Sequence, residues 1–580
     1  MVITSLPKTG VVISSFSPFL ASRMGTVSFV FFVALDTDPE SLYNLVKLET
    51  PCQARGDRWG DEIASLHSQR QNKKSSQAKY GEFLHFNYDI ILFMHKQDQT
   101  RTPYIEGLIK YVQENRLPFH MPGHKQGQGI HPLLKNILGD KVFQYDLTEV
   151  DGVDYLHNPT GILKEAQDLA AELYKVDQTF FLINGSTVGN QAAILTMADR
   201  GEKVLVTRNA HRSVYGALAL GGLIPVYLQP LYDQSLGMTT FPLPQQLDDA
   251  LKKDTSIKGV ILTSPNYYGF SAYVKEFIDI THRYNLPILA DEAHGAHYPF
   301  HPQLPPSAIE YGADLVLHST HKTLSSFTQS SLLHVNEGKI DTYKLKSYLN
   351  ILETSSPNYL LLMSLDAARM QMATQGYELL SQAIVCAEWL RNEINSIPGL
   401  QVYTNEKAKT SKAIADMDPT KLTVMVNGIG LNGYEADKIL GRELKIEPEL
   451  TDHKNVLLFI TIGEDVGRMR EVKKAFEILA IKYRNTAKPI TYPHPPPLPP
   501  QELTPEEALR TSSESVDLLS SLGRVSAQIV TPYPPGLPVV SYGEKITPEV
   551  IEYIQELLEI GAEVHGLNGE DHNPKIRVVS

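Results

Sequence analysis

The sequence predicts an α/β protein whose central sheet is mostly parallel. Several short apolar runs lack polar alternation, helical segments lie between most of them, and polar residues gather where the runs end. Such runs are typical of strands that helices cover on both faces. The predicted strands span residues 179–183, 203–207, 259–263, 286–291, 313–318 and 330–335. A helix is expected over 163–176, where apolar side chains recur along one helical face.

Length and composition indicate an enzyme of several domains. A chain of 580 residues is too long for one compact core, and 42% hydrophobic with 21% charged residues is ordinary for a globular protein. The formal net charge of −13 argues against a nucleic-acid partner. The only cysteines, Cys52 and Cys386, lie far apart, which fits a reducing cytoplasm and gives no cysteine-built metal site.

The first 93 residues differ from the rest of the chain. The apolar run from Met24 to Leu35 is shorter than the roughly 20 residues of a membrane-spanning helix, and we interpret it as a buried strand. The polar sequence that follows shows no periodicity, so residues 1–93 are expected to form a weakly structured extension. Met94 is a candidate for the true start of the protein. An N-terminal sequence of the native protein that begins well before Met94 would contradict this hypothesis.

Four further segments follow this extension. We expect a large domain over residues 94–380, a small α/β domain over 381–487, a proline-rich linker over 488–501 and a C-terminal α+β domain over 502–580. The strands of the small domain are predicted in "TKLTVMV", "KIEPEL" and "VLLFITIG". The C-terminal domain should begin with a helix that Thr504 and Glu507 cap reciprocally.

The first predicted strand leads into "NGSTVGN", a turn followed by a helix. Free amides at the start of a helix attract phosphate, and Ser186 and Thr187 add hydroxyl groups. Taken alone, either residue could equally be a simple helix cap. The turn matches neither of the common glycine-rich nucleotide motifs, so it predicts a phosphate site without a dinucleotide or ATP.

A second polar cluster, "DEAHGAH", follows the strand at 286–291. Asp291 comes directly after buried residues, where a carboxylate needs a cation or several hydrogen-bond donors. His294 and His297 could join the acid in a metal site, but no third ligand motif supports one. Asp291 could also be a core carboxylate whose hydrogen bonds are all made within the protein.

Lys322 follows the next strand, 31 residues after Asp291, so both side chains can reach one crevice at the carboxyl ends of the strands. A phosphate cradle, an acid that needs a cation and a lysine match the three handles of pyridoxal 5'-phosphate. These handles are its phosphate, its ring nitrogen and an aldehyde that forms an imine, or Schiff base, with lysine.

These motifs together resemble the bacterial ornithine/lysine/arginine decarboxylase family in its short, wingless form. The likeness runs from about residue 100 to about residue 570 and is carried by "FHMPGHKQG", "NGSTVGN", "RNAHRS", "DEAHGAH", "STHKTLSSFTQSS" and "PYPPGLP". It implies an aspartate-aminotransferase-like large domain of fold type I that binds pyridoxal phosphate, and a C-terminal decarboxylase domain. It also implies a homodimer or a larger homo-oligomer with a shared active site.

The resemblance assigns roles to individual residues. Lys322 would join the cofactor, Asp291 would contact its ring nitrogen, and Ala293 and His211 would sandwich its ring. Ser186, Thr187, Ser319 and His321 would surround the phosphate, and Ser356 would reach the phosphate of the neighbouring subunit. Lys322 and His294 are both candidates for protonating the carbanion.

The implied reaction converts a basic amino acid to its amine and carbon dioxide, in polyamine or diamine synthesis. Arginine or lysine is favoured over ornithine, and the distal cation of the substrate calls for a carboxylate. Glu544, Asp154 and His124 are the predicted substrate residues. The alternatives are an aminotransferase or aldolase of the same fold, or a catalytically silent regulatory relative.

Overall fold

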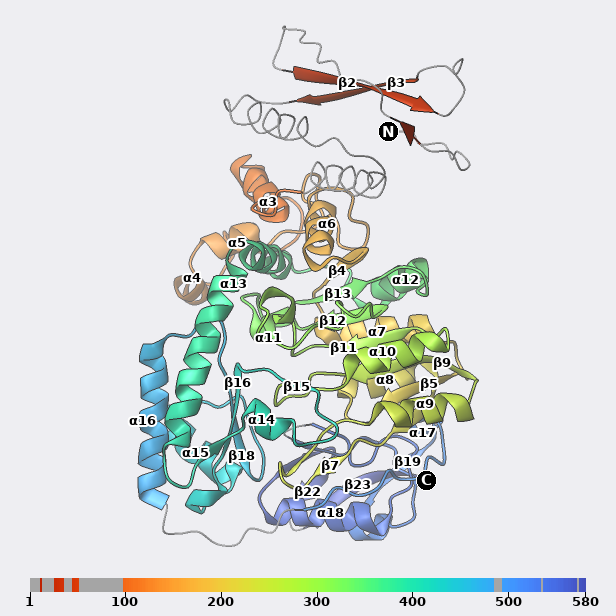
Figure 1. The fold of residues 1–580 in the computed structure, drawn as a ribbon, viewed down its shortest axis with the longest axis vertical. Helices are drawn as coiled ribbons and strands as arrows, with labels where there is room; N and C mark the ends of the chain where they lie inside the picture. Colours follow the sequence, from red (N-terminus) through yellow and green to blue (C-terminus); the bar gives the residue numbers. More distant parts are fainter. Residues whose placement is uncertain are drawn as a thin grey trace, which may run out of the picture. The chain divides into compact units, whose positions relative to one another are not determined.

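The computed structural model divides the chain into two compact units, residues 1–96 and 97–580 (Figure 1). It describes residues 97–483, 493–533, 536–570 and 573–580, together with the backbone of three strands in the first unit. These strands are β1 (Val11–Val12), β2 (Thr26–Leu35) and β3 (Asn44–Pro51), and they pair antiparallel in this order. The predicted strand at 24–35 thus corresponds to β2, and β1 and β3 are further strands within the extension that we expected to be weakly structured. The other residues of that extension, Met94 included, lie outside the described residues.

A seven-stranded sheet forms the centre of the second unit (Figure 1). Its order is β4 (Gln178–Leu182), β13 (Ser331–Val335), β12 (Leu315–His318), β11 (Ile288–Asp291), β9 (Ile257–Thr263), β5 (Lys203–Thr207) and β6 (Ile224–Leu228). Only β13 runs antiparallel to its neighbours. All six predicted strands are therefore confirmed. The edge strand β6 was not predicted, because Pro225 interrupts its short apolar run, and proline is tolerated at a sheet edge.

Alternate residues of each central strand pack on opposite faces of the sheet. Ile261 and Leu289 pack with helices α7 (Gly185–Met197), α8 (Arg212–Gly221) and α12 (Thr342–Leu352). Their neighbours Leu262 and Ala290 pack with α9 (Pro244–Lys253) and α10 (Val274–Arg283) on the other face. Because both faces are covered, most positions of these strands are apolar, and the polar residues stand mainly at the strand ends.

Three helices form a further layer at one end of the sheet. They are α3 (Pro103–Gln113), α6 (Ile162–Tyr174) and the 37-residue α13 (Tyr359–Asn395). The helix predicted at 163–176 is confirmed by α6. The short helices α4 (Pro132–Leu138) and α5 (Lys141–Tyr145) lie between α3 and α6 in the sequence.

A smaller antiparallel sheet follows α13. Its order is β14 (Gln401–Val402), β16 (Lys421–Met425), β18 (Asn455–Phe459) and β17 (Leu450–Thr451), and it packs with α15 (Gly433–Arg442) and α16 (Val466–Tyr483). The predicted strand "KIEPEL" is wrong except for its last residue. Lys445 has a positive φ of 59° and Pro448 cannot donate a backbone hydrogen bond, so the run does not extend as a strand.

The C-terminal part contains α17 (Pro505–Arg510), α18 (Pro548–Glu559), β19 (Ser513–Asp517) and β23 (Asn573–Val579). The predicted capping box is confirmed, since Thr504 and Glu507 each accept a hydrogen bond from the backbone of the other. The remaining short elements of the second unit are α11 (Thr320–Thr323), α14 (Asn405–Ala408), β7 (Tyr232–Asp233), β8 (Met238–Thr239), β10 (Phe270–Ser271), β15 (Asp416–Met417), β20 (Thr531–Tyr533), β21 (Glu563–His565) and β22 (Asn568–Glu570).

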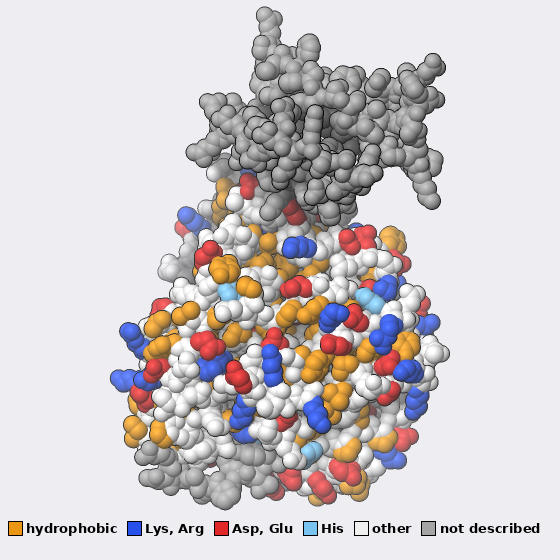
Figure 2. Space-filling model, viewed as in Figure 1, with side chains coloured by type: hydrophobic (Ala, Val, Ile, Leu, Met, Phe, Trp, Pro, Cys, Tyr) orange, Lys and Arg blue, Asp and Glu red, His pale blue; other side chains and the backbone are white. Residues whose placement is uncertain are grey.

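Charges of both signs are interspersed on the face of the molecule that Figure 2 draws, with apolar side chains between them. This mixing leaves no single-sign field over that described surface. Across the described residues, no helix is both long and apolar enough to cross a membrane.

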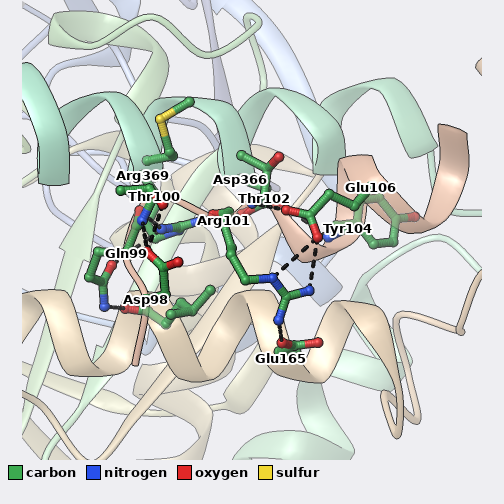
Figure 3. Close-up of polar contacts among 12 residues, drawn as sticks. Asp98, Gln99, Thr100, Arg101, Thr102, Tyr104, Glu106, Glu165, Asp366 and Arg369 are labelled. Atoms are coloured by element: carbon green, nitrogen blue, oxygen red, sulfur yellow. Dashed lines mark hydrogen bonds and ion pairs between the residues drawn. The ribbon is translucent and has the colours of Figure 1, made fainter. Parts of the chain in front are cut away.

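A buried ion pair on α13 holds the beginning of the second unit (Figure 3). The guanidinium of Arg369 donates to Asp366 Oδ1 at 2.8 Å, to the carbonyl of Gln99 at 2.9 Å and to the carbonyl of Arg101. The second oxygen of Asp366 accepts the amide of Tyr104 at 3.1 Å. Residues 99–104, which lead into the first turn of α3, are thereby fixed.

We predict that Arg369→Ala lowers the free energy of unfolding by about 3–5 kcal/mol, because it leaves the buried carboxylate of Asp366 without its cation. Arg101→Ala is the matched control. The side chain of Arg101 is 46% exposed and pairs only with the surface acids Glu106 and Glu165, so its loss should cost about 1 kcal/mol or less. Urea unfolding of both variants measures the difference, and equal costs would contradict the assignment.

Candidate active site

A cavity of about 450 Å³ lies where the strands of the large sheet end. Its wall includes residues that directly follow β4, β5, β9, β11 and β12, which is the expected position for a ligand on a mostly parallel sheet. Segments of the C-terminal part and of the proline-rich stretch, such as 536–539 and 495–499, complete the wall.

The strand register brings the predicted acid and lysine together. Asp291, the last residue of β11, lies opposite Leu317 of β12, and the chain then turns through α11, which contains Lys322. Burial lowers the pKa of the Lys322 amine below its ordinary value, although the nearby charge of Asp291 acts in the opposite direction. A lowered pKa increases the neutral, nucleophilic fraction of the amine.

His294 lies directly against this lysine. Its Nε2 is 2.9 Å from Lys322 Nζ, and its ring packs on Tyr267 with centroids 4.4 Å apart. Burial, and then the charge of Lys322, hold the pKa of His294 well below the ordinary histidine value. The imidazole is therefore neutral and can exchange a proton with the amine at Nζ.

Hydroxyl groups gather at the start of α7. Ser186 Oγ lies 2.5 Å from Ser319 Oγ and 3.0 Å from Ser331 Oγ, and Gly185 adopts a φ of 73° that forms the preceding turn. His321 donates from Nδ1 to the carbonyl of Ser330 at 2.7 Å. Ser186, Thr187, Ser319 and His321 all line the cavity, beside the helix end that favours an anion.

Asp291 is oriented by two donors. Asn190 Nδ2 donates to Oδ2 at 2.9 Å, and the amide of Ala293 donates to Oδ1 at 3.3 Å. His211 begins α8 as its N-cap, and it lines the cavity together with Asp291 and Ala293. The structure therefore gathers all the predicted cofactor residues except Ser356 around one cavity.

Glu292, which follows Asp291, belongs to a separate buried network. It accepts hydrogen bonds from His318 at 3.0 Å and from Ser307 at 2.6 Å. His318 in turn lies 3.1 Å from His334, whose other ring nitrogen lies 2.9 Å from Thr179 Oγ1. This network joins the end of β11 to β12, β13 and β4 beneath the cavity.

His297 does not join the cavity residues. Its Nε2 lies 2.9 Å from Asp418, a buried acid, and both side chains are buried. Within the part of the chain that the structure describes, no cluster of three or more His, Cys, Asp or Glu residues could hold a metal ion.

Glu544, a predicted substrate residue, does not line the cavity. Its carboxylate forms a bidentate ion pair with Arg208, at 2.5 and 2.8 Å, and also accepts the amide of Ser541 at 2.7 Å. Arg208, rather than Glu544, lines the cavity, and its guanidinium lies over the rings of Tyr227 and Tyr215. The negative charge of Glu544 is therefore already neutralised within the protein.

Asp154, His124 and Ser356 also lie outside this cavity. Asp154 accepts the amides of Gly161 and Leu163 at the start of α6, as a helix-capping carboxylate does. His124 lies 2.9 Å from Asp146, and Ser356 is exposed in the loop before α13. Each of the three therefore lies away from the cavity of its own chain, and their roles, for Ser356 at the neighbouring subunit, stay predictions.

Three cavity residues were not predicted. Asn190 is a buried polar residue of α7, Arg208 is the first residue of the motif "RNAHRS", and Tyr267 follows β9. Asn190 had a detectable signal, since it lies one helical turn after Ser186 and so shares its face. Arg208 stood within a motif that the resemblance used but received no role, and Tyr267 carried no signal that distinguishes it from a surface loop residue.

Glu353 supports the turn before α7 from behind. Its Oε1 accepts the amide of Ile183 at 3.1 Å, whereas Oε2 is buried and has no partner among the described residues. Burial raises the pKa of this carboxyl group to about 7.

Comparison with known proteins places these features in a family. A family model described as the Orn/Lys/Arg decarboxylase major domain matches residues 102–468, and one described as the C-terminal domain of that family matches residues 490–576. An arginine decarboxylase of Bacillus anthracis is 37% identical over 475 residues, which are 82% of this chain and 96% of that protein. The arginine decarboxylase of Bacillus subtilis is 35% identical over 472 residues, covering 81% and 96%.

Solved structures are similar as well. A lysine decarboxylase of Francisella novicida superposes with a TM-score of 0.72 at 20% identity, covering 87% of this chain and 84% of that one. The constitutive lysine decarboxylase of Escherichia coli gives the same TM-score, at 20% identity and coverages of 83% and 82%. At such identities the likeness shows the fold alone, and it confirms the predicted fold class.

We predict that Glu353→Gln changes the pH dependence of stability. The folded-state pKa of about 7 lies above the ordinary value of a glutamate, so the neutral carboxyl stabilises the fold at low pH and this contribution is lost as the pH rises through about 7. The variant should therefore gain about 2–3 kcal/mol relative to the native protein between pH 5 and pH 8. Urea unfolding at both pH values measures the gain. Glu378→Gln, at an exposed position of α13, should show none.

Proposed function

Because the chain belongs to the Orn/Lys/Arg decarboxylase family, we propose that it converts arginine or lysine, and less readily ornithine, to the corresponding amine and carbon dioxide. As a member of this family it is a carboxy-lyase. The relatives of highest identity named above act on arginine by name, which supports arginine as the first substrate to test. The products would feed polyamine or diamine synthesis in the cytoplasm.

The observation that carries this proposal is the buried amine of Lys322 beside both Asp291 and His294, at the strand ends that hold Ser186 and Ser319. These groups fit pyridoxal 5'-phosphate. Lys322 would take its aldehyde, Asp291 its ring nitrogen, and His211 with Ala293 its two ring faces. Ser186, Thr187, Ser319 and His321 would take its phosphate.

Unpaired buried atoms support this fit. Thr263 Oγ1, Asn266 Nδ2 and His294 Nδ1 all belong to residues of the cavity wall and find no partner among the described residues. A buried polar atom without a partner costs about 1–3 kcal/mol, and a polar ligand would relieve this cost.

When bound, the cofactor supplies an electron sink for the electron pair that remains on the α-carbon after carbon dioxide leaves. The carboxylate of Asp291 would hold a proton at the ring nitrogen, because an adjacent negative charge favours the protonated form. Lys322 and His294 lie 2.9 Å apart, so either can deliver the proton that the α-carbon needs, and the other can replace it.

We also propose that two copies of the chain form a homodimer with a shared active site. Helix α4 buries none of its residues, and its apolar side chains Leu133, Leu134, Ile137 and Leu138 are 43–69% exposed. Phe119 before this helix and Phe327, five residues after Lys322, are also exposed. Apolar surface of this extent favours a protein partner, and a second copy would place it beside the loop that carries Lys322.

We predict that Lys322→Ala lowers the rate of carbon dioxide release by at least about a hundredfold, because the nucleophilic amine is lost. Release from arginine, lysine and ornithine is measured in parallel, together with the visible absorbance of protein and pyridoxal phosphate. Lys258→Ala, at a lysine that is 48% exposed, is the control and should behave as the native protein. Near-normal release by the Lys322 variant would remove this residue from its role, and transfer to a 2-oxo acid without release would favour an aminotransferase.

We predict that Leu133→Asp combined with Ile137→Asp raises the dissociation constant of the dimer by at least about a hundredfold, since both charges would be buried at the interface. Analytical ultracentrifugation measures the constant. Ile481→Asp on α16, where the isoleucine is 83% exposed, is the matched control and should leave the dimer intact. A native protein that sediments as a monomer would contradict the proposal.

A further inference from the structure

We propose that Asn190 and Ser213 are positioning residues that join Asp291 to His211 through one directed hydrogen-bond chain, so that an ionised Asp291 keeps the imidazole of His211 neutral. The inference deepens the proposed function, on which it rests. Asp291, Asn190 and His211 line the cavity, whereas Ser213 lies behind it. The four residues come from β11, α7 and α8.

The hydrogen-bond chain begins at Asn190, whose side chain is 1% exposed. Its Nδ2 donates to Asp291 Oδ2 at 2.9 Å and to Ser213 Oγ at 3.0 Å, which uses both amide hydrogens. The amide orientation follows from the acid, because an ionised carboxylate only accepts hydrogen bonds. A rotated amide would bring two oxygens together.

Ser213 carries the next hydrogen bond of this hydrogen-bond chain. Its Oγ accepts from Asn190, so its hydroxyl hydrogen is free to point to His211 Nδ1, which lies 2.8 Å away. The backbone amide of Ser213 also donates to Nδ1, at 3.3 Å. Because Nδ1 accepts from both groups, it carries no hydrogen, and His211 is the neutral tautomer with its hydrogen on Nε2.

Burial and the charges around His211 affect whether its imidazole is protonated. Burial lowers the pKa of His211, Lys322 and Arg212 act in the same direction, and Asp291 acts against them. A protonated His211 would need a hydrogen on Nδ1 and would break the chain at Ser213. A neutral ring also avoids repelling the positive ring nitrogen that Asp291 is proposed to hold.

Two features argue that the chain serves the site rather than the core alone. Asn190 Oδ1 has no partner among the described residues, so the amide is incompletely satisfied by the protein. Asn190 also donates to both Asp291 and Ser213, and the hydroxyl of Ser213 can donate onward to His211, which links a cavity acid to a cavity imidazole across three elements.

The test measures pyridoxal phosphate binding rather than activity alone. Wild type, Ser213→Ala and Asn190→Asp are titrated with pyridoxal phosphate, and the dissociation constant and the pH midpoint of the bound absorbance band are recorded. Thr196→Ala is the matched control, because Thr196 is a buried hydroxyl of α7 that bonds only to the carbonyl of Ala192. Melting temperatures are recorded for all four proteins.

Ser213→Ala removes the hydrogen bonds that the hydroxyl makes to Asn190 and to His211, and it should weaken binding about fivefold and shift the pH midpoint, because Nδ1 of His211 can then take a proton. Asn190→Asp places a second carboxylate against Asp291 and should weaken binding by at least about tenfold, more at pH 8 than at pH 6. Thr196→Ala should change neither quantity.

The outcomes separate the two proposals. A wild-type protein that gives no absorbance band would overturn the proposed function and this inference with it. A wild-type band together with an unchanged constant and midpoint in Ser213→Ala would overturn this inference alone. If Asn190→Asp does not fold, Ser213→Ala decides the question. Equal effects of Ser213→Ala and Thr196→Ala would show that the hydrogen-bond chain contributes only to core packing.

Discussion

The hydrogen-bond register between β9, β11 and β12 is the constraint on which the site depends. It places Asp291 opposite Thr263 on one side and Leu317 on the other, so that the acid, the start of the lysine turn and the end of β9 share one sheet edge. A slip by one residue would turn every side chain of a strand to the other face. The covering of both faces by apolar helices makes such a slip costly, and thus the core fixes the position of the chemistry.

Asp291 and Glu292, the neighbouring acids at the end of β11, have different surroundings because their side chains point in different directions. Asp291 lines the cavity, whereas Glu292 is satisfied by His318, Ser307 and the amide of Ala308 below it. The second acid ties the strands together, whereas the first faces the cavity. Most buried charges elsewhere in the described chain are paired in the same way, as between Arg369 and Asp366.

The sequence allowed prediction of features that depend on neighbours along the chain. Asp291, Lys322 and Ser186 follow apolar strands, and the strand ends of a parallel sheet meet at one edge. Pairing across long sequence separations was not predictable. The pairing of Glu544 with Arg208 was not predicted, because the two residues lie 336 positions apart and a carboxylate in a loop gives no sign of its partner. Asn190 was missed because a polar residue within a helix is more often exposed.

The same ion pair has a consequence for how the protein assembles during synthesis. Domains generally fold from the N-terminus as the chain emerges, and the strands that flank Arg208 emerge long before residue 544. Until then the guanidinium has no buried counter-ion, so its burial against Tyr215 and Tyr227 is unfavourable, and the wall also lacks the segments 495–499 and 536–539. The cavity is therefore completed only when the last part of the chain has left the ribosome, and a truncated polypeptide would present the sheet without a finished binding site.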